Sequence, residues 1–198
     1  TIYLDGAEGG TGAGPHLATE ETGIPLMAAI PEARRALEDV GLVDEIDLVV
    51  AGGIRNGGDV AKCLALGAKA VALGTAALMA LNCNKHIEGV TDYEGTIGVP
   101  AGECYHCHTG RCPVGVATQD VELRKRLDVE EAALRVYNFL HTLTMEVQLL
   151  ARACGKTDIH SLEPEDLAAL THEAAAMAKV PLAGTTYIPG VTEERALQ

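Results

Sequence analysis

Three short strand-like runs alternate with helical stretches over the first part of the chain. The runs are Ile2–Leu4, Ile46–Val50 and Ala70–Leu73, and the first two are expected to be buried strands. Parallel strands need a long crossover between them, usually a helix, and helical stretches follow these runs. The alternation therefore predicts an α/β fold with a parallel sheet, either open or closed into a barrel.

The helices between the runs are marked by apolar periodicity and by glycine stops. The stretch 28–40 carries apolar residues at helical spacing and ends at Gly41. A second helix is expected to begin at Asp59 and to end at Gly67, because glycine readily adopts the left-handed conformation that stops a helix. A short apolar helix follows Thr75.

The C-terminal part of the chain is predicted to be helical. One long amphipathic helix covers 129–153 and ends at Gly155, and a further helix covers about 163–179. The residues after Pro181 are expected to form a loop or tail. The apolar stripe expected on the long helix consists of Leu134, Val136, Tyr137, Leu140, Leu143, Val147 and Leu150.

A glycine-rich turn follows each of the three runs. The loop 5–15 is so rich in glycine that its backbone is expected to approach another group closely. Gly52–Gly53 and Gly74–Thr75 follow the second and third runs, and bare N–H groups at a helix start suit a phosphate. In (β/α)8 barrels, phosphate commonly binds at the turns after strands 7 and 8. The alternative is that these glycines only form tight turns between strand and helix.

Three of the six cysteines are compressed into a C-x2-C-x4-C-P pattern at Cys104, Cys107 and Cys112. Few other cysteines occur and no secretory signal is seen, which disfavours a disulfide framework. The pattern favours thiolate ligation of an iron–sulfur cluster or, with an interleaved histidine as fourth ligand, of zinc. Cys63 lies in a helical stretch and is expected to be a reduced core cysteine. The interleaved histidines are His106 and His108.

The charge balance argues against two classes of partner. The chain has 15 Lys and Arg against 28 Asp and Glu, a net charge of −13. Such a chain repels phosphate backbones and anionic lipid, so neither nucleic acid nor a membrane is expected as a partner. No apolar stretch approaches the roughly 20 residues that span a bilayer, and a cytoplasmic location is the default expectation.

Four motifs occur in order along the chain: Asp5–Ala13 (DGAEGGTGA), Ala51–Val60 (AGGIRNGGDV), Leu73–Leu78 (LGTAAL) and Cys112–Gln119 (CPVGVATQ). Together they resemble the FMN-binding synthase domain of glutamate synthase, over nearly the whole chain. The resemblance implies the C-terminal part, about strands 6–8, of a (β/α)8 TIM barrel, followed by an iron–sulfur loop and C-terminal helices. The corresponding segments are 1–82, 83–118 and 119–198.

The resemblance also implies a reaction and partners. In that family an FMN-carrying barrel converts 2-iminoglutarate, made from 2-oxoglutarate and ammonia, into glutamate, and electrons pass through an iron–sulfur cluster. The implied partners are the remainder of the synthase barrel, a glutaminase domain or subunit that supplies ammonia, and an electron-donor subunit or ferredoxin. Since a whole barrel needs about 250 residues, the chain is expected to be a fragment, a split subunit or a truncated gene product, poorly soluble or inactive unless the missing half is supplied.

Two charged residues, one in the first glycine loop and one beside the second, each have two possible roles. Glu8 is either a proton donor or orienter at the flavin edge or an exposed loop carboxylate. Arg55 either caps the FMN phosphate or pairs with Asp59. The implied cofactor-binding residues are Gly9, Gly10, Gly52, Gly53, Ile54, Arg55, Gly74 and Thr75.

The cysteine spacing differs from that of the usual bacterial members of the glutamate synthase family. In those proteins the pattern C-x5-C-x4-C-P holds a 3Fe-4S cluster. Cys83 follows the helix after the third run, but 23 residues separate it from Cys107, and Cys104 is an extra thiol. Either Cys104 replaces Cys83 as the first ligand, or both join Cys107 and Cys112 around a 4Fe-4S cluster. The cysteine pattern resembles the archaeal-type enzymes.

Three rival functions remain open at the level of sequence. A related amine-forming flavoenzyme, of the N-methylglutamate synthase type, would share every motif. A catalytically incomplete electron-transfer or regulatory module would keep the cofactor segments without turnover. A zinc-binding structural domain would hold zinc and no flavin.

Overall fold

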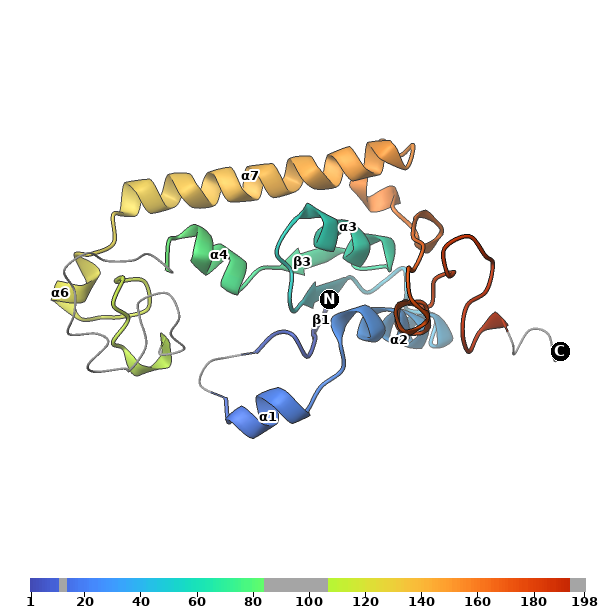
Figure 1. Cartoon of the computed structure of the whole chain (residues 1–198), viewed down its shortest axis with the longest axis horizontal. Helices are drawn as coiled ribbons and strands as arrows, with labels where there is room; N and C mark the ends of the chain where they lie inside the picture. The colour runs from blue at the N-terminus through green and yellow to red at the C-terminus, as the bar shows by residue number, and fades with distance from the viewer. Residues whose placement is uncertain (11–13, 84–106, 193–198) are drawn as a thin grey trace. The chain divides into compact units, whose positions relative to one another are not determined.

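The computed structural model describes residues 1–10, 14–83 and 107–192, which divide into two compact units (Figure 1). Unit 1 comprises residues 1–9, 22–73 and 143–198, and unit 2 comprises residues 10–21 and 74–142. The chain passes from one unit to the other after Gly9, after Glu21, after Leu73 and within the long helix α7, Val129–Ala153.

Unit 1 contains a three-stranded parallel sheet in the order β1-β2-β3. The strands are β1 Ile2–Asp5, β2 Leu48–Ala51 and β3 Ala70–Ala72. Leu4 pairs with Val50, and Val50 pairs with Val71, so β2 is the central strand. The prediction of a mixed α/β fold with a parallel sheet is therefore confirmed.

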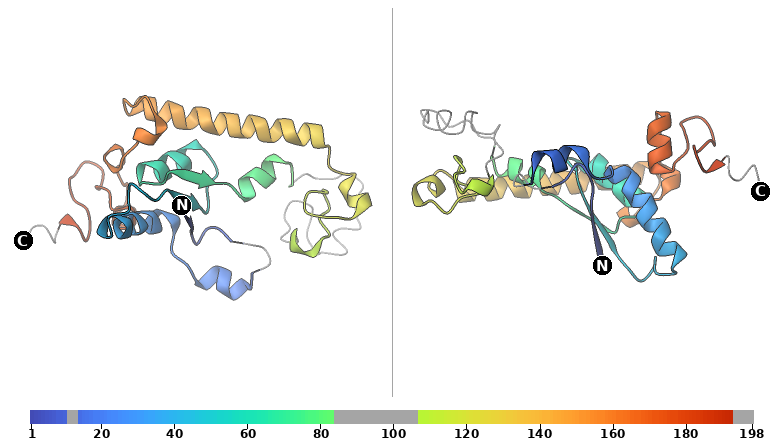
Figure 2. Two further views of the ribbon diagram at one scale, coloured as in Figure 1. Left: turned by 180° about the vertical axis from the view of Figure 1, so that it is seen from behind. Right: turned by 90° about the horizontal axis from the view of Figure 1, so that it is seen from below.

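The first strand is exposed, although its apolar run predicts a buried one. Ile2 and Tyr3 are 44% and 59% exposed, whereas Val50 of β2 is fully buried. β1 is an outer strand, and among the described residues its only strand partner is β2 (Figure 2). Because β1 has a strand on one side only, its other edge is uncovered by the described residues, and its apolar side chains remain exposed.

Three helices complete the core of unit 1. They are α2 Leu26–Asp39, α3 Gly57–Ala65 and α8 His172–Ala178. α2 packs against β1, β2 and α8, and α3 packs against β3 and the short 3-10 helix η2, Ile159–Ser161. The largest fully buried side chains there include Ile30, Val50, Cys63 and Val147.

The helix ends follow the glycine stops, but one helix start does not follow the prediction. Gly41, Gly67 and Gly155 all have positive φ just beyond α2, α3 and α7. α3 begins at Gly57 rather than at Asp59, because the side chain of Asn56 accepts a hydrogen bond from the Asp59 N–H and so caps the helix earlier.

The prediction of one continuous helix over 163–179 is wrong. A 3-10 turn η3, Pro164–Asp166, is followed by extended backbone, and α8 begins only at His172 after its cap Thr171. The cause is a long-range pairing. The Ala169 N–H donates to the Pro181 carbonyl and the Ala169 carbonyl accepts from the Ala183 N–H, both at 2.8 Å. This pairing takes the backbone groups that a continuous helix needs.

Unit 2 holds shorter elements and the first part of α7. They are α1 His16–Glu21, α4 Thr75–Ala80, the 3-10 turn η1 Cys107–Thr109 and α6 Val121–Arg124. The long helix has the predicted bounds, but its expected stripe is only partly buried. Leu134 and Tyr137 are exposed, and the buried side chains on α7 are Ala132, Leu143, Val147 and Ala151.

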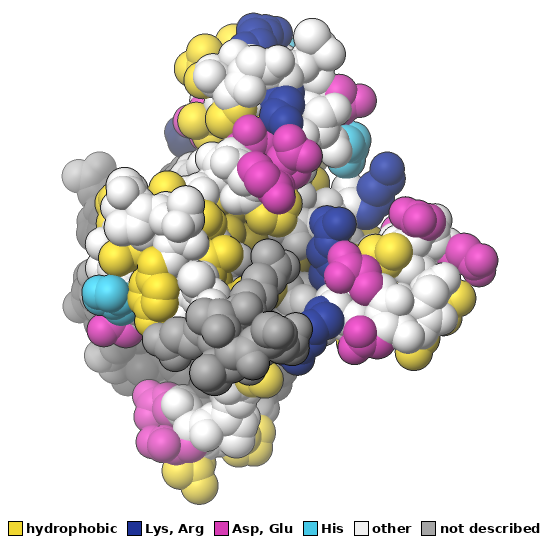
Figure 3. All heavy atoms as spheres, turned by 90° about the vertical axis from the view of Figure 1, so that its right-hand side faces the viewer, with side chains coloured by type: hydrophobic (Ala, Val, Ile, Leu, Met, Phe, Trp, Pro, Cys, Tyr) yellow, Lys and Arg dark blue, Asp and Glu magenta, His cyan; other side chains and the backbone are white. Residues whose placement is uncertain are grey.

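Basic and acidic side chains lie beside one another on the face shown in Figure 3. Lys156 is one example, since its Nζ lies 2.5 Å from Glu163 Oε1 and 3.5 Å from Asp166 Oδ2. The hydrogen bond from Glu163 raises the pKa of Lys156. None of the described helices is both long enough and apolar enough to cross a bilayer.

Candidate functional site

The turn after β2 lies directly against the loop after β1. Gly52 and Gly53 have φ of +121° and +67°, conformations that favour glycine. A Cβ placed on Gly52 would lie 3.2 Å from the Cα of Gly6, and the Gly6 N–H donates to the Ala51 carbonyl at 2.8 Å. These glycines therefore allow two loops to meet backbone to backbone, as expected for the glycine-rich loop after β1.

Glu8 bridges this contact and the start of α2. Glu8 as a whole is exposed, yet its Oε2 accepts a hydrogen bond from the Leu26 N–H at 2.9 Å. Its stem fills the space beside Gly53, where an added Cβ would lie 2.9 Å from the Glu8 Cβ. The carboxylate thus serves as a remote cap for α2, whose own N-cap residue, Pro25, makes no side-chain cap hydrogen bond.

Arg55 pairs with Asp59, the second of its two expected alternatives. Its Nε lies 3.6 Å from Asp59 Oδ2, and its backbone N–H donates to the same oxygen at 3.1 Å. The Arg55 side chain is 79% exposed, so this ion pair holds it weakly. Ile54, between this arginine and the glycines, is buried and anchors the turn in the core.

The start of α3 is held by a residue that the sequence does not point to. Glu146 on α7 accepts a hydrogen bond at its Oε2 from the Gly57 N–H at 2.7 Å, across 89 positions of sequence. A Cβ on Gly57 would lie 2.3 Å from the Glu146 Cβ. No local pattern in the sequence predicts this contact. The helical spacing on α7 predicts which face is apolar, but it does not predict which distant residue a polar side chain will contact.

The glycine turn after β3 has open space where a side chain on Gly74 would lie. Gly74 is the N-cap residue of α4 and makes no side-chain cap hydrogen bond. A Cβ on Gly74 or Gly10 would meet no described atom within 4 Å, whereas a Cβ on Gly9 would lie 2.1 Å from Asp5 Oδ1. Open backbone at Gly74, followed by Thr75, fits a phosphate in its chemistry.

The cysteines of the predicted metal segment are described only in part. Cys112 is buried, Cys83 is half-buried and Cys107 is exposed, and all three are thiols rather than disulfides. Cys104 and His106 lie outside the described residues. Within the described ranges, no group of three or more His, Cys, Asp or Glu side chains is placed to hold a metal ion. Cysteine thiolates are suitable ligands for an iron–sulfur cluster or for zinc, but the described residues alone do not form a complete metal site.

Cys63 is the core cysteine that its helical stretch predicts. It is buried in α3, and burial, with a smaller contribution from the charge of Asp59, raises its pKa to about 11. Such a thiol is a poor nucleophile and a poor metal ligand at neutral pH.

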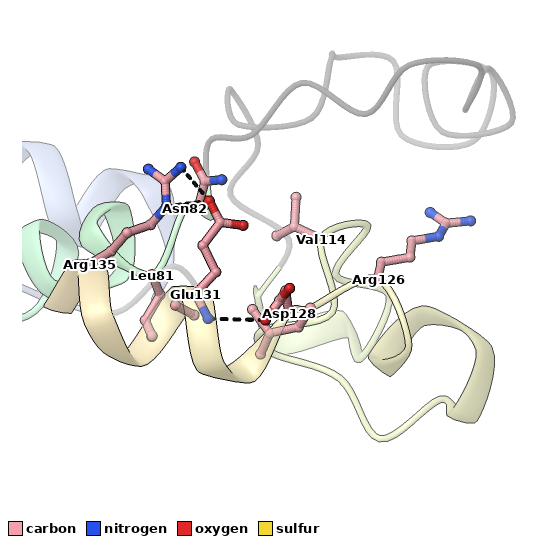
Figure 4. A pocket seen from close by; sticks show the side chains of 9 residues that line it. Leu81, Asn82, Val114, Arg126, Asp128, Glu131 and Arg135 are labelled. Atoms are coloured by element: carbon pink, nitrogen blue, oxygen red, sulfur yellow. Dashed lines mark hydrogen bonds and ion pairs between the residues drawn. The ribbon is translucent and has the colours of Figure 1, made fainter.

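A small pocket in unit 2 joins the segments that carry Cys83 and Cys112. Asn82, next to Cys83, and Val114, two residues after Cys112, line it together with the start of α7 (Figure 4). Arg135 donates to Glu131 Oε1 at 2.7 Å on one wall. The other lining residues are Leu81, Arg126, Leu127, Asp128 and Ala132.

Comparison with known proteins gives a consistent result. The family described as "Conserved region in glutamate synthase" matches residues 1–157. A glutamate synthase large subunit-like protein of Rhizobium meliloti is 53% identical over 190 residues, which are 96% of this chain and 42% of that protein. The archaeal glutamate synthase (NADPH) of Methanocaldococcus jannaschii is 41% identical over 161 residues, 81% of this chain and 28% of that protein. The chain thus spans less than half the length of these relatives.

Proposed function

The chain belongs to the glutamate synthase family, and from this premise we propose that it is part of an oxidoreductase that forms L-glutamate from 2-oxoglutarate and glutamine-derived ammonia, with FMN and an iron–sulfur cluster as cofactors. The observation that carries the proposal is the parallel pairing of β2 and β3. Ala51 pairs with Ala72, so both strands end at one edge of the sheet, and each is followed by a glycine turn. Ligands of parallel α/β folds bind beyond the carboxyl ends of the strands.

The proposed FMN contacts are backbone groups of the glycine turns. Gly52, Gly53, Ile54, Gly74 and Thr75 are proposed to bind the cofactor phosphate with their N–H groups. Gly9 and Gly10 are proposed to lie along the cofactor. When bound, FMN supplies the hydride for reduction of the imine, and the protein binds, orients and excludes water. Arg55 is exposed and weakly paired, which leaves its guanidinium available to a phosphate.

The proposed iron–sulfur ligands are Cys107 and Cys112, with Cys83 and Cys104 as candidates for the remaining positions. The pocket that brings Asn82 and Val114 together supports Cys83, because the neighbours of Cys83 and Cys112 then lie in one small region of unit 2.

The partners are proposals of the same kind. The exposed strand β1 supports a further strand beside it, supplied by the remainder of a synthase barrel. A glutaminase domain or subunit is proposed to supply ammonia. An electron-donor subunit is proposed as the source of reducing power, and the name of the Methanocaldococcus jannaschii relative supports NADPH.

The test is glutamate formation by the intact protein, purified without oxygen and supplied with 2-oxoglutarate, glutamine and a reductant. Replacing glutamine by ammonium separates the synthase reaction from ammonia supply, and replacing it by methylamine tests the N-methylglutamate type of reaction. Glutamate formation with ammonium supports the proposal. A preference for methylamine, or no turnover with any nitrogen donor, contradicts it.

A further inference from the structure

The turn after β2 contacts two glutamate side chains that come from distant parts of the chain. Glu8 reaches it from the loop after β1, and Glu146 reaches it from α7. Both contacts lie within unit 1. They meet the turn at opposite ends, Gly53 and Gly57.

At the first end, Glu8 ties the turn to α2. Its Cβ would lie 2.9 Å from a Cβ on Gly53, so the stem sits directly against the turn. Its Oε2 accepts from the Leu26 N–H at 2.9 Å, in the first turn of a 14-residue helix. A negative charge at that position is favoured by the helix dipole. The turn therefore cannot shift towards Glu8 without breaking this cap.

At the second end, Glu146 ties the turn to α7. The Gly57 N–H donates to its Oε2 at 2.7 Å, and the Leu143 carbonyl would lie 2.8 Å from a Cβ on Gly57. The helix is firmly seated there, because Leu143 and Val147 on either side of Glu146 are buried. This contact uses the first N–H of α3, a group that a helix start otherwise offers to an anion.

We infer that Glu8 and Glu146 are positioning residues that fix the turn of Gly52 and Gly53 for the cofactor phosphate, rather than groups that take part in the reaction. The inference rests on the proposed function, since the phosphate is that of FMN. It assigns a role to α7, which the sequence presents only as an amphipathic helix. It also assigns Glu8 a structural bond in place of the flavin-edge role.

The experiment compares FMN dissociation constants of the intact protein after removal and return of the flavin. The variants are Glu8→Ala, Glu8→Gln, Glu146→Ala and Glu146→Gln. Glu45→Ala and Glu130→Ala are matched controls, since both are exposed glutamates, the first in unit 1 and the second at the start of α7. Hydrogen exchange of the Leu26 and Gly57 amides is measured in the same samples.

Both alanine variants are expected to weaken FMN binding by about fivefold to tenfold, because a charge-assisted hydrogen bond is lost. The glutamine variants keep an acceptor oxygen and are expected to stay within about twofold of the unmodified protein. The Leu26 amide should exchange faster in Glu8→Ala only, and the Gly57 amide faster in Glu146→Ala only.

Unchanged FMN affinity in both alanine variants would overturn the inference. So would a Glu8→Gln variant that binds FMN normally but loses about 100-fold or more in kcat, since Glu8 would then act on a proton. An unmodified protein that binds no FMN contradicts the proposed function, whereas unmodified protein that binds FMN beside unaffected variants contradicts only this inference.

Discussion

Arg126 donates a hydrogen bond from Nη1 to the carbonyl of Pro113 at 3.1 Å, and Pro113 directly follows the buried Cys112. The bond joins the residues after α6 to the turn that carries this cysteine. In the same turn, a Cβ on Gly115 would lie 2.4 Å from the Leu123 carbonyl, so the segment is closely packed.

Removal of the Arg126 guanidinium is expected to loosen this turn. Arg126→Ala should lower the free energy of unfolding by about 1 kcal/mol, the usual net value of one hydrogen bond. Urea unfolding of the intact protein measures it. Lys125→Ala is the matched control, because Lys125 pairs with the exposed Glu122 and loss of such a surface ion pair should cost little. Equal effects of the two substitutions would contradict the role of Arg126.

Alanine substitutions at two adjacent glycines at the start of α3 should have different effects on the stability of the protein. Gly57→Ala places a Cβ 2.3 Å from the Glu146 Cβ, and we expect a loss of about 1–3 kcal/mol from overpacking. Gly58→Ala meets only Asn56 Oδ1 at 3.2 Å and should leave stability unchanged or raise it. Thermal or urea unfolding compares them. A Gly57→Ala protein as stable as Gly58→Ala would show that α7 does not seat against this turn.

The buried thiol of Cys63 should make stability depend on alkaline pH. Its pKa is raised from the ordinary value of 9.0 to about 11, chiefly by burial, so the thiolate is disfavoured only in the folded protein. The free energy of unfolding should therefore fall as the pH rises from 9 towards 11, by at most about 1.4 kcal/mol per pH unit.

Urea unfolding at several pH values tests this, and Cys63→Ala should remove that part of the slope. Cys154→Ala is the control, because Cys154 is an exposed cysteine beyond the end of α7. Identical slopes for the unmodified protein and Cys63→Ala would refute the expectation.

Iron content distinguishes the cysteine ligands. The double variant Cys107→Ala, Cys112→Ala should lose its iron, and Cys63→Ala should retain it, since a buried thiol with a raised pKa is a poor ligand. Single Cys83→Ala and Cys104→Ala variants then decide between three and four ligands. Metal analysis of anaerobically purified intact protein gives the readout. Unchanged iron in the double variant would show that the ligand assignment is wrong, and stoichiometric zinc without iron would favour a zinc site.

Much of the fold could be predicted from local patterns. The bounds of α7 and the glycine stops at Gly41, Gly67 and Gly155 follow from periodicity and from the left-handed conformation of glycine. The buried β2 follows from its β-branched run. These features depend on residues close together in the sequence, which a pattern can detect.

The features of the fold and site that the sequence did not predict correctly depend on residues far apart in the chain. The helix expected over 163–179 is interrupted because Ala169 pairs with Pro181 and Ala183. β1 is exposed because sheet neighbours, rather than its own composition, decide burial. In the candidate site, Glu8 could be singled out as an acidic residue within a glycine loop, but its bond to Leu26 and the contact of Glu146 with Gly57 have no local signal.

The central claim is that this chain belongs to an enzyme that carries both FMN and an iron–sulfur cluster. The most direct measurement is the absorption spectrum of the intact protein purified without oxygen, with flavin, iron and zinc measured on the same sample. The account predicts flavin absorbance over a broad iron–sulfur background, with FMN and iron both present in stoichiometric amounts. A colourless protein that contains zinc and no flavin would contradict it.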